Sequence, residues 1–537
     1  MKTGIFVGGK FVDTGSKIVS ISPSTEEPIS EVSVAEGKFI EEALNYAWES
    51  RKKKVEKSKF IKLKEILIEH VEEISELIAI EQGKPIAEAI TAEIYPSLSA
   101  IDFLLEKGEQ ILEAREMVPH EPLFKNREAR LFLEPYGILF LISPSNYPFV
   151  IPFINIIMAV YTGMPVIFRP SKLTPLIGLK IGELFQEAGF PEHVLQILIT
   201  EHDDVERILR DRRVSTVIFT GSVSVGRRIA QIAGESLKKP ILELGGNDVM
   251  LVLEDANIQR AAAGAVWGAF MNAGQTCASI ERILVHKNLK EKLVSLMKEK
   301  MSMLKVGNPL EADTDLGPLV SKQQKEKVMK HMKEAEEKGA MKIVSQTPIP
   351  EKGYFLAPHI FLDVPVNTKI WEEETFGPVV AIKDFENEKE AIELANSSNY
   401  ALTSSIWTEN KKRAWEIAQK LEVGTVTIND HISSFVEPSA PWGGFKWSGI
   451  GRVHGEAGLR EFLQIKYVMG DFSKRKTLFW WFNYSKKKVE ILNATLKFIY
   501  GRGKLKAGLK LLPHIPRLAK ELGIFNLFST IGKLFGI

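Results

Sequence analysis

Short apolar runs alternate with helical patterns from about residue 136 onward, and this alternation is the strongest constraint on how the chain can fold. Four such runs lie at residues 137–142, 165–168, 194–199 and 216–219. Each is rich in β-branched or aromatic side chains, and each is followed by a turn and then by apolar residues at helical spacing. This order is typical of βαβ units. The sequence therefore predicts an α/β fold built on a doubly wound parallel sheet.

A second alternating block covers residues 246–430, with strand candidates at 249–252, 282–285 and 426–428. A chain of 537 residues is too long for one ordinary hydrophobic core. We therefore expect two α/β domains side by side, with a cleft between them. Ahead of these blocks, the first 30 residues read as short strands and turns, and residues 38–115 follow a helical pattern.

Cys277 is the only cysteine in the chain, and it ends the segment Gly-Gln-Thr-Cys. A single cysteine excludes an intrachain disulfide and any metal site that needs two thiolates from one chain. Two interpretations remain, a catalytic nucleophile or a buried thiol. Because free cysteine is among the most buried residue types, the cysteine taken alone favours the buried thiol.

A glycine-containing corner joins the predicted strand 216–219 to a helical pattern. Gly221 lets the main chain turn sharply, and a helix that starts near Ser222 offers unpaired N–H groups to a phosphate. The spacing of Gly221 and Gly226 does not follow the Gly-x-Gly-x-x-Gly pattern, so this segment alone is a weak sign of dinucleotide binding. A tight turn capped by Ser222 explains it equally well.

Two more polar residues stand out by their surroundings. Glu243 lies between two leucines and before a glycine pair, and an acid in apolar surroundings tends to have the raised pKa that suits a general base. A helix cap or a salt bridge is the simpler explanation for Glu243 alone. Asn146 follows the predicted strand 137–142, where its amide can donate to a developing oxyanion, although turn formation also explains an Asn there.

Taken together, these segments resemble the aldehyde dehydrogenase superfamily. The resemblance covers roughly residues 1–470, and the glutamate and cysteine segments at this separation are a specific marker of the family. The matching segments are Ser-Asn-Tyr-Pro (145–148), Arg-Pro-Ser-Lys-Leu-Thr-Pro (169–175), Phe-Thr-Gly-Ser (219–222), Leu-Glu-Leu-Gly-Gly (242–246), Gly-Gln-Thr-Cys (274–277), Gly-Pro-Leu (317–319), Glu-Glu-Thr-Phe-Gly-Pro-Val (373–379) and Pro-Trp-Gly-Gly-Phe-Lys-Trp-Ser-Gly (441–449).

The resemblance implies a role for each candidate residue. Cys277 would attack the aldehyde carbon as a thiolate, with Asn146 and the Cys277 N–H holding the oxyanion, and Glu243 would activate the water that releases the acid. Glu374 would hold the nicotinamide ribose and Phe376 would lie beside the ring. The residues implied in binding NAD or NADP are Arg169, Lys172, Gly221, Ser222, Gly226, Leu244, Glu374 and Phe376. No metal is implied.

The family also implies a three-part subunit that forms a homodimer or homotetramer. The three parts are a dinucleotide-binding domain (1–115 and 136–245), a catalytic domain (246–453) and an oligomerisation element (116–135 and 454–472). A C-terminal extension (473–537), which the family does not require, is expected to follow them.

The segment Arg169-Pro-Ser-Lys172 departs from the family pattern. The usual wording is Lys-Pro-Ser/Ala-Glu, in which the glutamate would repel a ribose 2′-phosphate. Lys172 would attract that phosphate, so we expect the enzyme to accept NADP and lean toward it. The alternative is that Lys172 points to solvent.

A second departure concerns the substrate. Succinate-semialdehyde members of the family carry an arginine shortly after the Asn-x-Pro segment, whereas residues 149–158 contain no cation. A carboxylate would be poorly solvated beside such residues, so we expect an apolar aliphatic aldehyde of medium or long chain, with succinate-semialdehyde oxidation as the alternative. A dry apolar neighbourhood is expected from Phe149, Phe153, Trp267, Phe270, Met271 and Phe435, with about half of them serving only as core.

Two other functions on the same fold are weaker. A non-catalytic binding protein is disfavoured because Cys277, Glu243 and Asn146 are all present. An acylating enzyme, which passes the thioester to phosphate or coenzyme A, does not need a water-activating base, so Glu243 argues against it.

The net charge of +2 conceals two different regions. Residues 471–537 hold 14 Lys and Arg against 3 Asp and Glu (+11), so residues 1–470 hold 56 against 65 (−9). The basic segment contains aromatic residues and apolar residues at helical spacing, for example in 489–499 and 518–535, and its longest uncharged run, 522–532, is too short to span a bilayer.

The composition of the basic segment predicts that it makes peripheral contact with an anionic membrane or that it covers the substrate entrance. Packing on the acidic globule or on a neighbouring subunit is the alternative. Nucleic-acid binding is less favoured because the aromatics alternate with large aliphatics. The first residues lack a signal-peptide pattern, so we expect the cytoplasm, with peripheral contact to the cytoplasmic membrane face.

Overall fold

The computed structural model describes residues 1–121, 124–125, 127–474, 476–478, 480–502 and 504–516. The described chain falls into two compact units, which are treated separately below. The larger unit comprises Met1–Ile111 and Pro135–Gln464, and the smaller one comprises Leu112–Glu134 and the chain from Ile465 on. The apolar run at 522–532 and the helix predicted at 518–535 lie outside the described residues.

The first sheet of the larger unit is built from the first block of apolar runs. Its order is β2-β1-β9-β8-β7-β10-β11-β21, and the five strands from β9 to β11 are parallel. The strands are β1 (Ile5–Val7), β2 (Lys10–Val12), β7 (Ile138–Ile142), β8 (Val166–Arg169), β9 (Leu195–Ile197), β10 (Val214–Thr220), β11 (Lys239–Glu243) and β21 (Gly449–Ile450). The prediction of strands at 137–142, 165–168 and 216–219 is confirmed within two residues, and the one at 194–199 is shorter than expected.

The second sheet has the order β14-β15-β16-β13-β12-β18-β19, in which β14 alone runs antiparallel to its neighbour. Its strands are β12 (Asp248–Val252), β13 (Ile280–His286), β14 (Met341–Val344), β15 (His359–Leu362), β16 (Val379–Phe385), β18 (Thr403–Trp407) and β19 (Thr425–Ile428). Alternate residues of β12 join two different core clusters, Val249 and Leu251 on one face and Met250 and Val252 on the other. Both faces are therefore buried, which explains the continuous apolar runs in the sequence.

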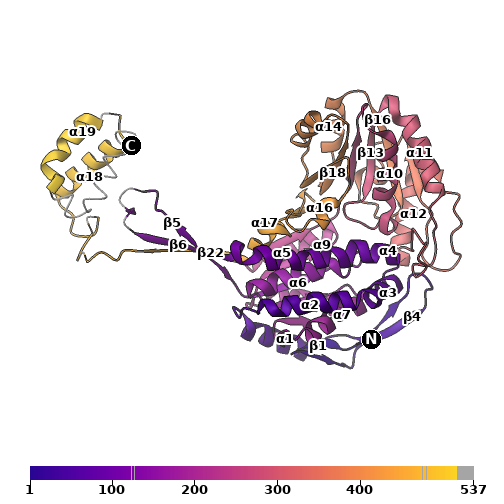
Figure 1. Ribbon diagram of the computed structural model, residues 1–537, viewed down its shortest axis with the longest axis horizontal. Coiled ribbons are helices and arrows are strands. Elements are labelled where there is room, and N and C mark those ends of the chain that lie inside the picture. The colour runs from indigo at the N-terminus through magenta and orange to yellow at the C-terminus, as the bar shows by residue number, and fades with distance from the viewer. Residues whose placement is uncertain (122–123, 126, 475, 479, 503, 517–537) are drawn as a thin grey trace. The chain divides into compact units, whose positions relative to one another are not determined.

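Helices cover the two sheets of the larger unit, as Figure 1 shows. On the first sheet, α1, α6, α7, α8 and α9 contact strands, and on the second sheet α10, α13, α14, α15 and α16 do so. The helices of this unit are α1 (Gly37–Ser50), α2 (Lys57–Glu69), α3 (Val71–Glu81), α4 (Ile86–Ala89), α5 (Tyr95–Leu112), α6 (Val150–Thr162), α7 (Pro175–Glu187), α8 (His202–Arg210), α9 (Val223–Glu235), α10 (Ile258–Phe270), α11 (Lys290–Ser302), α12 (Lys322–Glu337), α13 (Lys369–Glu372), α14 (Glu388–Asn396), α15 (Lys411–Ala418), α16 (Ser433–Val436) and α17 (Gly455–Glu461). The α/β fold class with doubly wound sheets is confirmed.

One helical segment differs from the expected regular pattern. Between α4 and α5 the chain forms a π-helical turn, η1 (Ile90–Ile94). Such turns are rare, and they occur frequently at functional sites. Two short antiparallel pairs, β3 (Lys17–Ile21) with β4 (Pro28–Ser33) and β17 (Tyr400–Ala401) with β20 (Phe445–Lys446), complete the larger unit.

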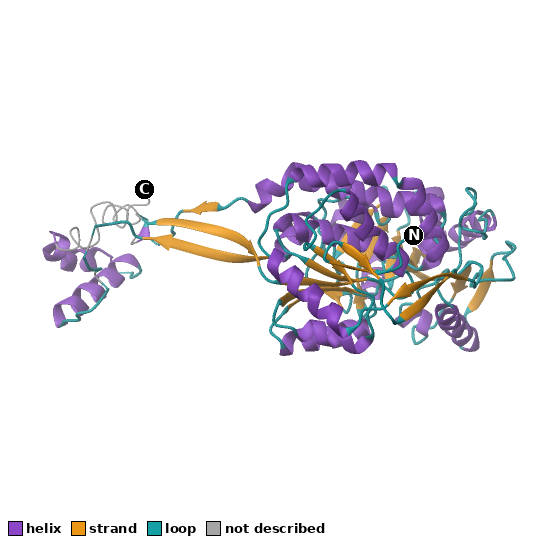
Figure 2. Cartoon of the chain, turned by 90° about the horizontal axis from the view of Figure 1, so that it is seen from below, coloured by secondary structure: helices purple, strands orange, loops and turns teal. Residues whose placement is uncertain are grey.

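The described residues of the smaller unit include a three-stranded sheet and the α-helices α18 and α19. The sheet order is β22-β6-β5, from β5 (Arg115–Met117), β6 (Glu128–Pro135) and β22 (Leu463–Gly470), and its paired strands are visible in Figure 2. The helices are α18 (Lys486–Ile499), which confirms the pattern predicted at 489–499, and α19 (Lys504–Leu511). No helix in the described part of the chain is long and apolar enough to cross a membrane. The oligomeric state stays a prediction.

Candidate active site

Cys277 lies in a loop between the 3₁₀ turn η3 (Met271–Gly274) and strand β13, and its side chain is partly exposed. Three consecutive residues before it have left-handed main-chain conformations, Asn272 and Ala273 at φ 53° and Gly274 at φ 72°. At Gly274 a side chain is impossible because a Cβ would lie 2.0 Å from the Gly377 carbonyl oxygen. Left-handed non-glycine residues cost on the order of 1 kcal/mol each, so the surrounding contacts must hold this turn in place.

Side chains from residues 82–88, which join α3 to α4 and begin α4, and from the turn itself supply those contacts. The Asn272 N–H donates to Glu88 Oε2 (2.8 Å), and Gln82 Nε2 donates to Asn272 Oδ1 (3.1 Å). Asn272 Nδ2 donates in turn to the carbonyl oxygens of Asn146 (3.0 Å) and Gln275 (3.1 Å). The turn before Cys277 is therefore tied both to the 82–88 segment and to the loop that carries Asn146.

The electrostatic surroundings of the Cys277 thiol favour its protonated form. Burial raises the pKa of the thiol above its usual value, and the carboxylates of Glu374, Asp248 and Glu243 raise it further, while the Ala278 N–H opposes them. A free thiolate is thus unfavourable in this arrangement, and the thiol must lose its proton to a base when it reacts.

Asn146 lies four residues after β7, and its side chain is almost fully buried. Asn146 Nδ2 donates to the Gln275 carbonyl oxygen at 2.8 Å, two residues before Cys277. A primary amide carries a second N–H. Asn146 can therefore donate a second hydrogen bond to an oxygen atom of a molecule bound beside the thiol.

A buried ion pair holds the main chain at Asn146. Lys84 Nζ donates to the Asn146 carbonyl oxygen (2.9 Å), pairs with the Glu93 carboxylate and lies 3.7 Å from the centre of the Tyr147 ring. Glu93 Oε2 accepts from the N–H groups that begin α6, at Phe149 (2.8 Å) and Val150 (3.1 Å). Both charges are therefore satisfied, as a buried pair requires.

Glu243 is the last residue of β11, and it is 6% exposed. Neither of its carboxyl oxygens has a hydrogen-bond partner within the described chain. Burial raises the pKa of Glu243 well above its usual value, although the charge of Arg452 opposes the rise. A carboxylate with a raised pKa is a stronger base toward water than an ordinary carboxylate.

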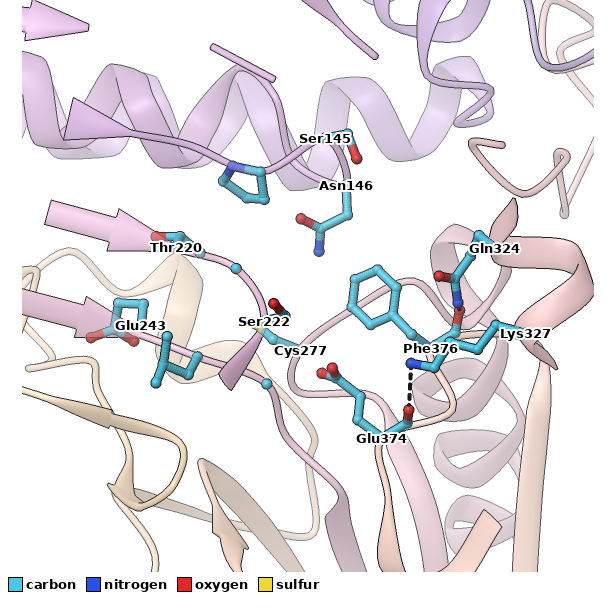
Figure 3. Close-up of a pocket in the computed structure, with 14 residues that line it drawn as sticks. Ser145, Asn146, Thr220, Ser222, Glu243, Cys277, Gln324, Lys327, Glu374 and Phe376 are labelled. Carbon is cyan, nitrogen blue, oxygen red and sulfur yellow. Dashed lines mark hydrogen bonds between the residues drawn. The ribbon is translucent and has the colours of Figure 1, made fainter. Parts of the chain in front are cut away.

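A polar pocket joins these residues (Figure 3). Asn146, the Phe376 ring and the Glu374 carboxylate point into it. Its lining residues are Pro144, Ser145, Asn146, Thr220, Gly221, Ser222, Glu243, Leu244, Gly245, Cys277, Gln324, Lys327, Glu374 and Phe376. They come from the carboxyl ends of β7, β10 and β11 and from segments of the second sheet region, so the two α/β halves of the larger unit meet here.

The N-terminus of α9 borders this pocket without a side-chain cap. Ser222 is the residue before the helix, and its hydroxyl contacts Ser224 Oγ (3.2 Å) instead of a main-chain N–H. The expectation of a cap by Ser222 is therefore wrong, and the N–H groups of the first turn stay available to an anion. Gly226 lies one turn further, where a Cβ would be 2.4 Å from Leu244.

The loop before β16 carries Glu374 and Phe376 into the polar pocket. The buried Glu281 accepts from the N–H groups of Thr375 (2.8 Å) and Phe376 (2.8 Å), and Lys327 Nζ donates to the Glu374 carbonyl oxygen (2.7 Å). The Gly246 N–H donates to Glu374 Oε1 (2.9 Å). Burial raises the pKa of Glu374 to about 7, against the opposing effects of Lys327 and this N–H.

A second, mainly apolar pocket meets the first at Cys277. Its aromatic residues Tyr147, Trp267, Phe435 and Trp442 surround a small hollow. The remaining lining residues are Glu88, Thr91, Ala92, Ile151, Met271, Thr276, Cys277, Ile432 and Val436. The thiol is thus placed between a polar and an apolar pocket.

The structure brings most of the predicted site residues together. Asn146, Gly221, Ser222, Glu243, Leu244, Cys277, Glu374 and Phe376 all line the polar pocket, whereas Arg169, Lys172 and Gly226 do not. Of the expected apolar neighbours, Trp267, Met271 and Phe435 line the second pocket, while Phe149, Phe153 and Phe270 lie in the core.

Arg169 and Lys172 lie at and after the carboxyl end of β8. Lys172 Nζ pairs with the carboxylate of Glu201, and that contact lowers the pKa of Glu201. The pair lies at the protein surface, where the side chain of Lys172 is 28% exposed and that of Glu201 is 58% exposed. Arg169 is half-buried, its Nη2 lies at the Thr200 carbonyl oxygen (3.5 Å), and its Nε has no partner within the described chain.

Several lining residues were not predicted from the sequence. Glu88 and Thr91 lie in the helical 38–115 region, and Gln324 and Lys327 lie on α12, where no motif indicates a site. Trp442 belongs to the segment 441–449, so its motif was a usable signal.

Comparison with known proteins agrees with this geometry. The sequence pattern of the aldehyde dehydrogenase family matches residues 11–468. The chain is 35% identical to 4,4′-diapolycopene aldehyde oxidase of Methylomonas sp., over 82% of each chain. It is 32% identical to mitochondrial succinate-semialdehyde dehydrogenase of Oryza sativa subsp. japonica, over 88% of this chain and 90% of that one.

A solved structure is equally similar. The NAD⁺ complex of aldehyde dehydrogenase from Bacillus cereus superposes with a TM-score of 0.84 at 31% identity, over 88% of this chain and 97% of that one. The two doubly wound sheets, the pocket at Cys277 and the match over residues 11–468 lead to one conclusion: the chain belongs to the aldehyde dehydrogenase family.

Proposed function

We propose that this aldehyde dehydrogenase oxidises an apolar aliphatic aldehyde of medium or long chain to the carboxylic acid, with NAD or NADP as the hydride acceptor. The observation that carries the proposal is the pocket beside Cys277, which has four aromatic walls and, among the residues that the structure describes, no Lys, Arg or His in its lining. Apolar surface favours an alkyl chain by about 0.8 kcal/mol for each buried CH₂ group.

The proposed roles follow from the positions of three residues. Cys277 forms a bond to the aldehyde carbon, and the proton of the thiol leaves to a base. The free N–H of the Asn146 amide stabilises the resulting oxyanion. Once the hydride has left, the thioester on Cys277 is hydrolysed by a water that Glu243 deprotonates, and this step restores the thiol.

The residues of the polar pocket fit a dinucleotide. The cofactor accepts the hydride when bound. The uncapped N-terminus of α9 at Ser222 suits a pyrophosphate, and Gly221 leaves the corner free of a side chain. Glu374 is partly buried, and its carboxylate can accept a hydrogen bond from a ribose hydroxyl. A Cβ at Gly245 would lie 2.5 Å from Glu374 Oε2. We assign cofactor binding to the domain built on the first sheet and catalysis to the domain built on the second sheet.

Among straight-chain aldehydes, we expect kcat/KM to rise from acetaldehyde to hexanal and decanal by about fourfold for each added CH₂ until the pocket is filled. Succinate semialdehyde is expected to be a poor substrate because its carboxylate would lie in this apolar pocket without a cation. Steady-state rates for these aldehydes, measured with NAD and with NADP, test both expectations. A higher kcat/KM for succinate semialdehyde than for hexanal would favour the alternative function.

For the cofactor, we propose that the enzyme accepts NADP and that Glu201 limits its preference. Lys172 is the cation expected near a 2′-phosphate, but its charge is already paired with Glu201. Glu201→Gln should therefore raise the NADP/NAD ratio of kcat/KM about fivefold, and Lys172→Glu should lower it by a similar factor. A strong preference for NAD in the parent enzyme that Glu201→Gln leaves unchanged would contradict the proposal.

We propose in addition that the C-terminal segment contacts an anionic membrane surface. Large apolar side chains there are exposed, including Trp481 (51%), Phe482 (79%) and Tyr500 (67%), and they accompany the exposed cations Lys486 and Lys487. Aromatic side chains favour the headgroup region, and each lysine adds about 1 kcal/mol of attraction to anionic lipid.

Reversal of the two charges tests the membrane contact. We expect the protein to sediment with vesicles that contain phosphatidylserine and to lose this binding in the double variant Lys486→Glu/Lys487→Glu. The matched control is Lys389→Glu/Lys412→Glu, which reverses two exposed lysines of the larger unit. Equal sedimentation of both double variants, or none of the parent protein, would contradict the contact.

A further inference from the structure

Glu88 is a carboxylate in the wall of a pocket that otherwise has no charged side chain. Besides Glu88, the only ionisable lining residues are Tyr147 and Cys277, and burial raises the pKa of both above their usual values, so both are neutral in the physiological range. A substrate group that enters this pocket therefore meets a single negatively charged side chain, that of Glu88.

Glu88 lies on α4, and the π-helical turn η1 begins two residues later. Thr91 and Ala92 of this turn line the same pocket as Glu88. These residues follow Glu88 by three and four positions, the spacing that places helical side chains on one face. One face of this helical segment therefore forms a wall of the pocket.

Glu88 also has a structural contact on the side of the nucleophile. Its Oε2 accepts the N–H of Asn272 (2.8 Å), the first of the left-handed residues before Cys277. Asn272 is in turn bonded to the Asn146 carbonyl oxygen (3.0 Å). One carboxylate therefore joins the substrate pocket to the turn that sets the position of the thiol.

We propose that Glu88 is a specificity-determining and positioning residue, which excludes aldehydes with a distal negative charge and fixes the turn before Cys277. The inference rests on the proposed oxidation of apolar aldehydes and names the residue that restricts it. A four-carbon aldehyde bound at Cys277 would have its distal group in the same small pocket as Glu88. Like charges at such separations repel strongly where water is scarce.

The charge of Glu88 depends on pH in the range where enzymes are assayed. Burial raises the pKa of Glu88 to about 7, with Asp315 adding to the rise, while the Asn272 N–H and Lys84 oppose it. Lys84 is itself paired with Glu93. Discrimination against an anionic aldehyde should therefore increase as pH rises through about 7, because Glu88 becomes charged.

Three aldehydes of similar length separate charge from fit: hexanal, succinate semialdehyde and 4-aminobutanal. In Glu88→Gln, which keeps an acceptor for the Asn272 N–H, kcat/KM for succinate semialdehyde relative to hexanal should rise about tenfold, and the ratio for 4-aminobutanal should fall. Glu88→Ala loses the acceptor as well, so kcat should fall for all three aldehydes, and Glu88→Gln should restore it. Glu76→Gln, the same change at an exposed site on α3, is the matched control.

The parent enzyme supplies a measurement that does not depend on the folding of any variant. Its hexanal/succinate-semialdehyde ratio of kcat/KM should increase between about pH 6 and pH 8, and the increase should be absent in Glu88→Gln. A ratio that stays flat with pH, or that Glu88→Gln leaves unchanged, would overturn the role of Glu88 while hexanal remains the better substrate. If the parent enzyme prefers succinate semialdehyde at every pH, the proposed function itself fails.

Discussion

Cys277→Ala is expected to abolish aldehyde oxidation, with kcat reduced at least about a thousandfold. Cys277 is the only cysteine, so no other thiol of the chain can replace it. It also lies where the polar and the apolar pocket meet, which is the position that a nucleophile between cofactor and substrate requires. The measurement is NADH or NADPH formation at saturating hexanal, together with the thermal unfolding midpoint of both proteins.

The single thiol makes an independent check simple. Iodoacetamide should add one group to the parent protein and none to Cys277→Ala, as intact-mass measurement shows directly. Because burial and the nearby carboxylates raise the pKa of the thiol, its alkylation rate should still be rising with pH where an ordinary thiol has begun to level off. Dinucleotide binding by the alanine variant is the control for an intact site. Activity close to that of the parent enzyme would contradict the nucleophile and revive the non-catalytic interpretation.

The sequence predicted the assembly of this site because parallel strands share an edge. Asn146, Gly221 and Glu243 follow or end β7, β10 and β11, which are adjacent in the sheet. The carboxyl ends of such strands face one crevice, so the apolar runs predicted at 137–142 and 216–219 were enough to place Asn146 and Gly221 together. No strand was predicted before Glu243, and Cys277 comes from the second sheet region, so only the family resemblance connected these two residues with the others.

The rest depends on contacts that no local pattern contains. Glu88 lies in a helical segment with ordinary spacing, and nothing in that segment indicates that its side chain lines the pocket beside Cys277. The partner of Lys172 is Glu201, which lies 29 residues further along the chain, after β9 in the sequence. The left-handed main chain at Asn272 and Ala273 could not be predicted either, because neither residue is a glycine and the turn is held by side chains from residues 82–88.

Glu243→Gln is expected to stop the enzyme after the first turnover. Bond formation at Cys277 and departure of the hydride do not need Glu243 as the base for water, whereas release of the acid does. Rapid mixing with hexanal should therefore produce a burst of NADH or NADPH of up to one equivalent, and the following steady-state rate should fall about a hundredfold to a thousandfold. Glu409→Gln, the same change at an exposed position, is the matched control.

The buried carboxyl group also makes stability depend on pH in a definite direction. The folded-state pKa of Glu243 is raised above its unfolded value, so the folded protein binds more protons between the two values. The stabilisation from the neutral carboxyl group is complete below the unfolded pKa and is lost as pH rises through the folded pKa. Glutamine cannot ionise, so Glu243→Gln should match the parent in thermal unfolding at low pH and exceed it increasingly at higher pH.

The same titration links the pH dependence of the stability of the protein to the proposed role of Glu243, because only the ionised carboxylate can accept a proton from water. The steady-state rate of the parent enzyme should therefore rise with pH over the range in which the parent becomes less stable than Glu243→Gln. Two independent measurements, a rate and an unfolding midpoint, should report one ionisation. If the rate rises with pH while the difference in unfolding midpoint between the two proteins stays constant, the rate-limiting base is a group other than Glu243. If Glu243→Gln shows no burst of NADH or NADPH, its reaction is blocked before the hydride leaves.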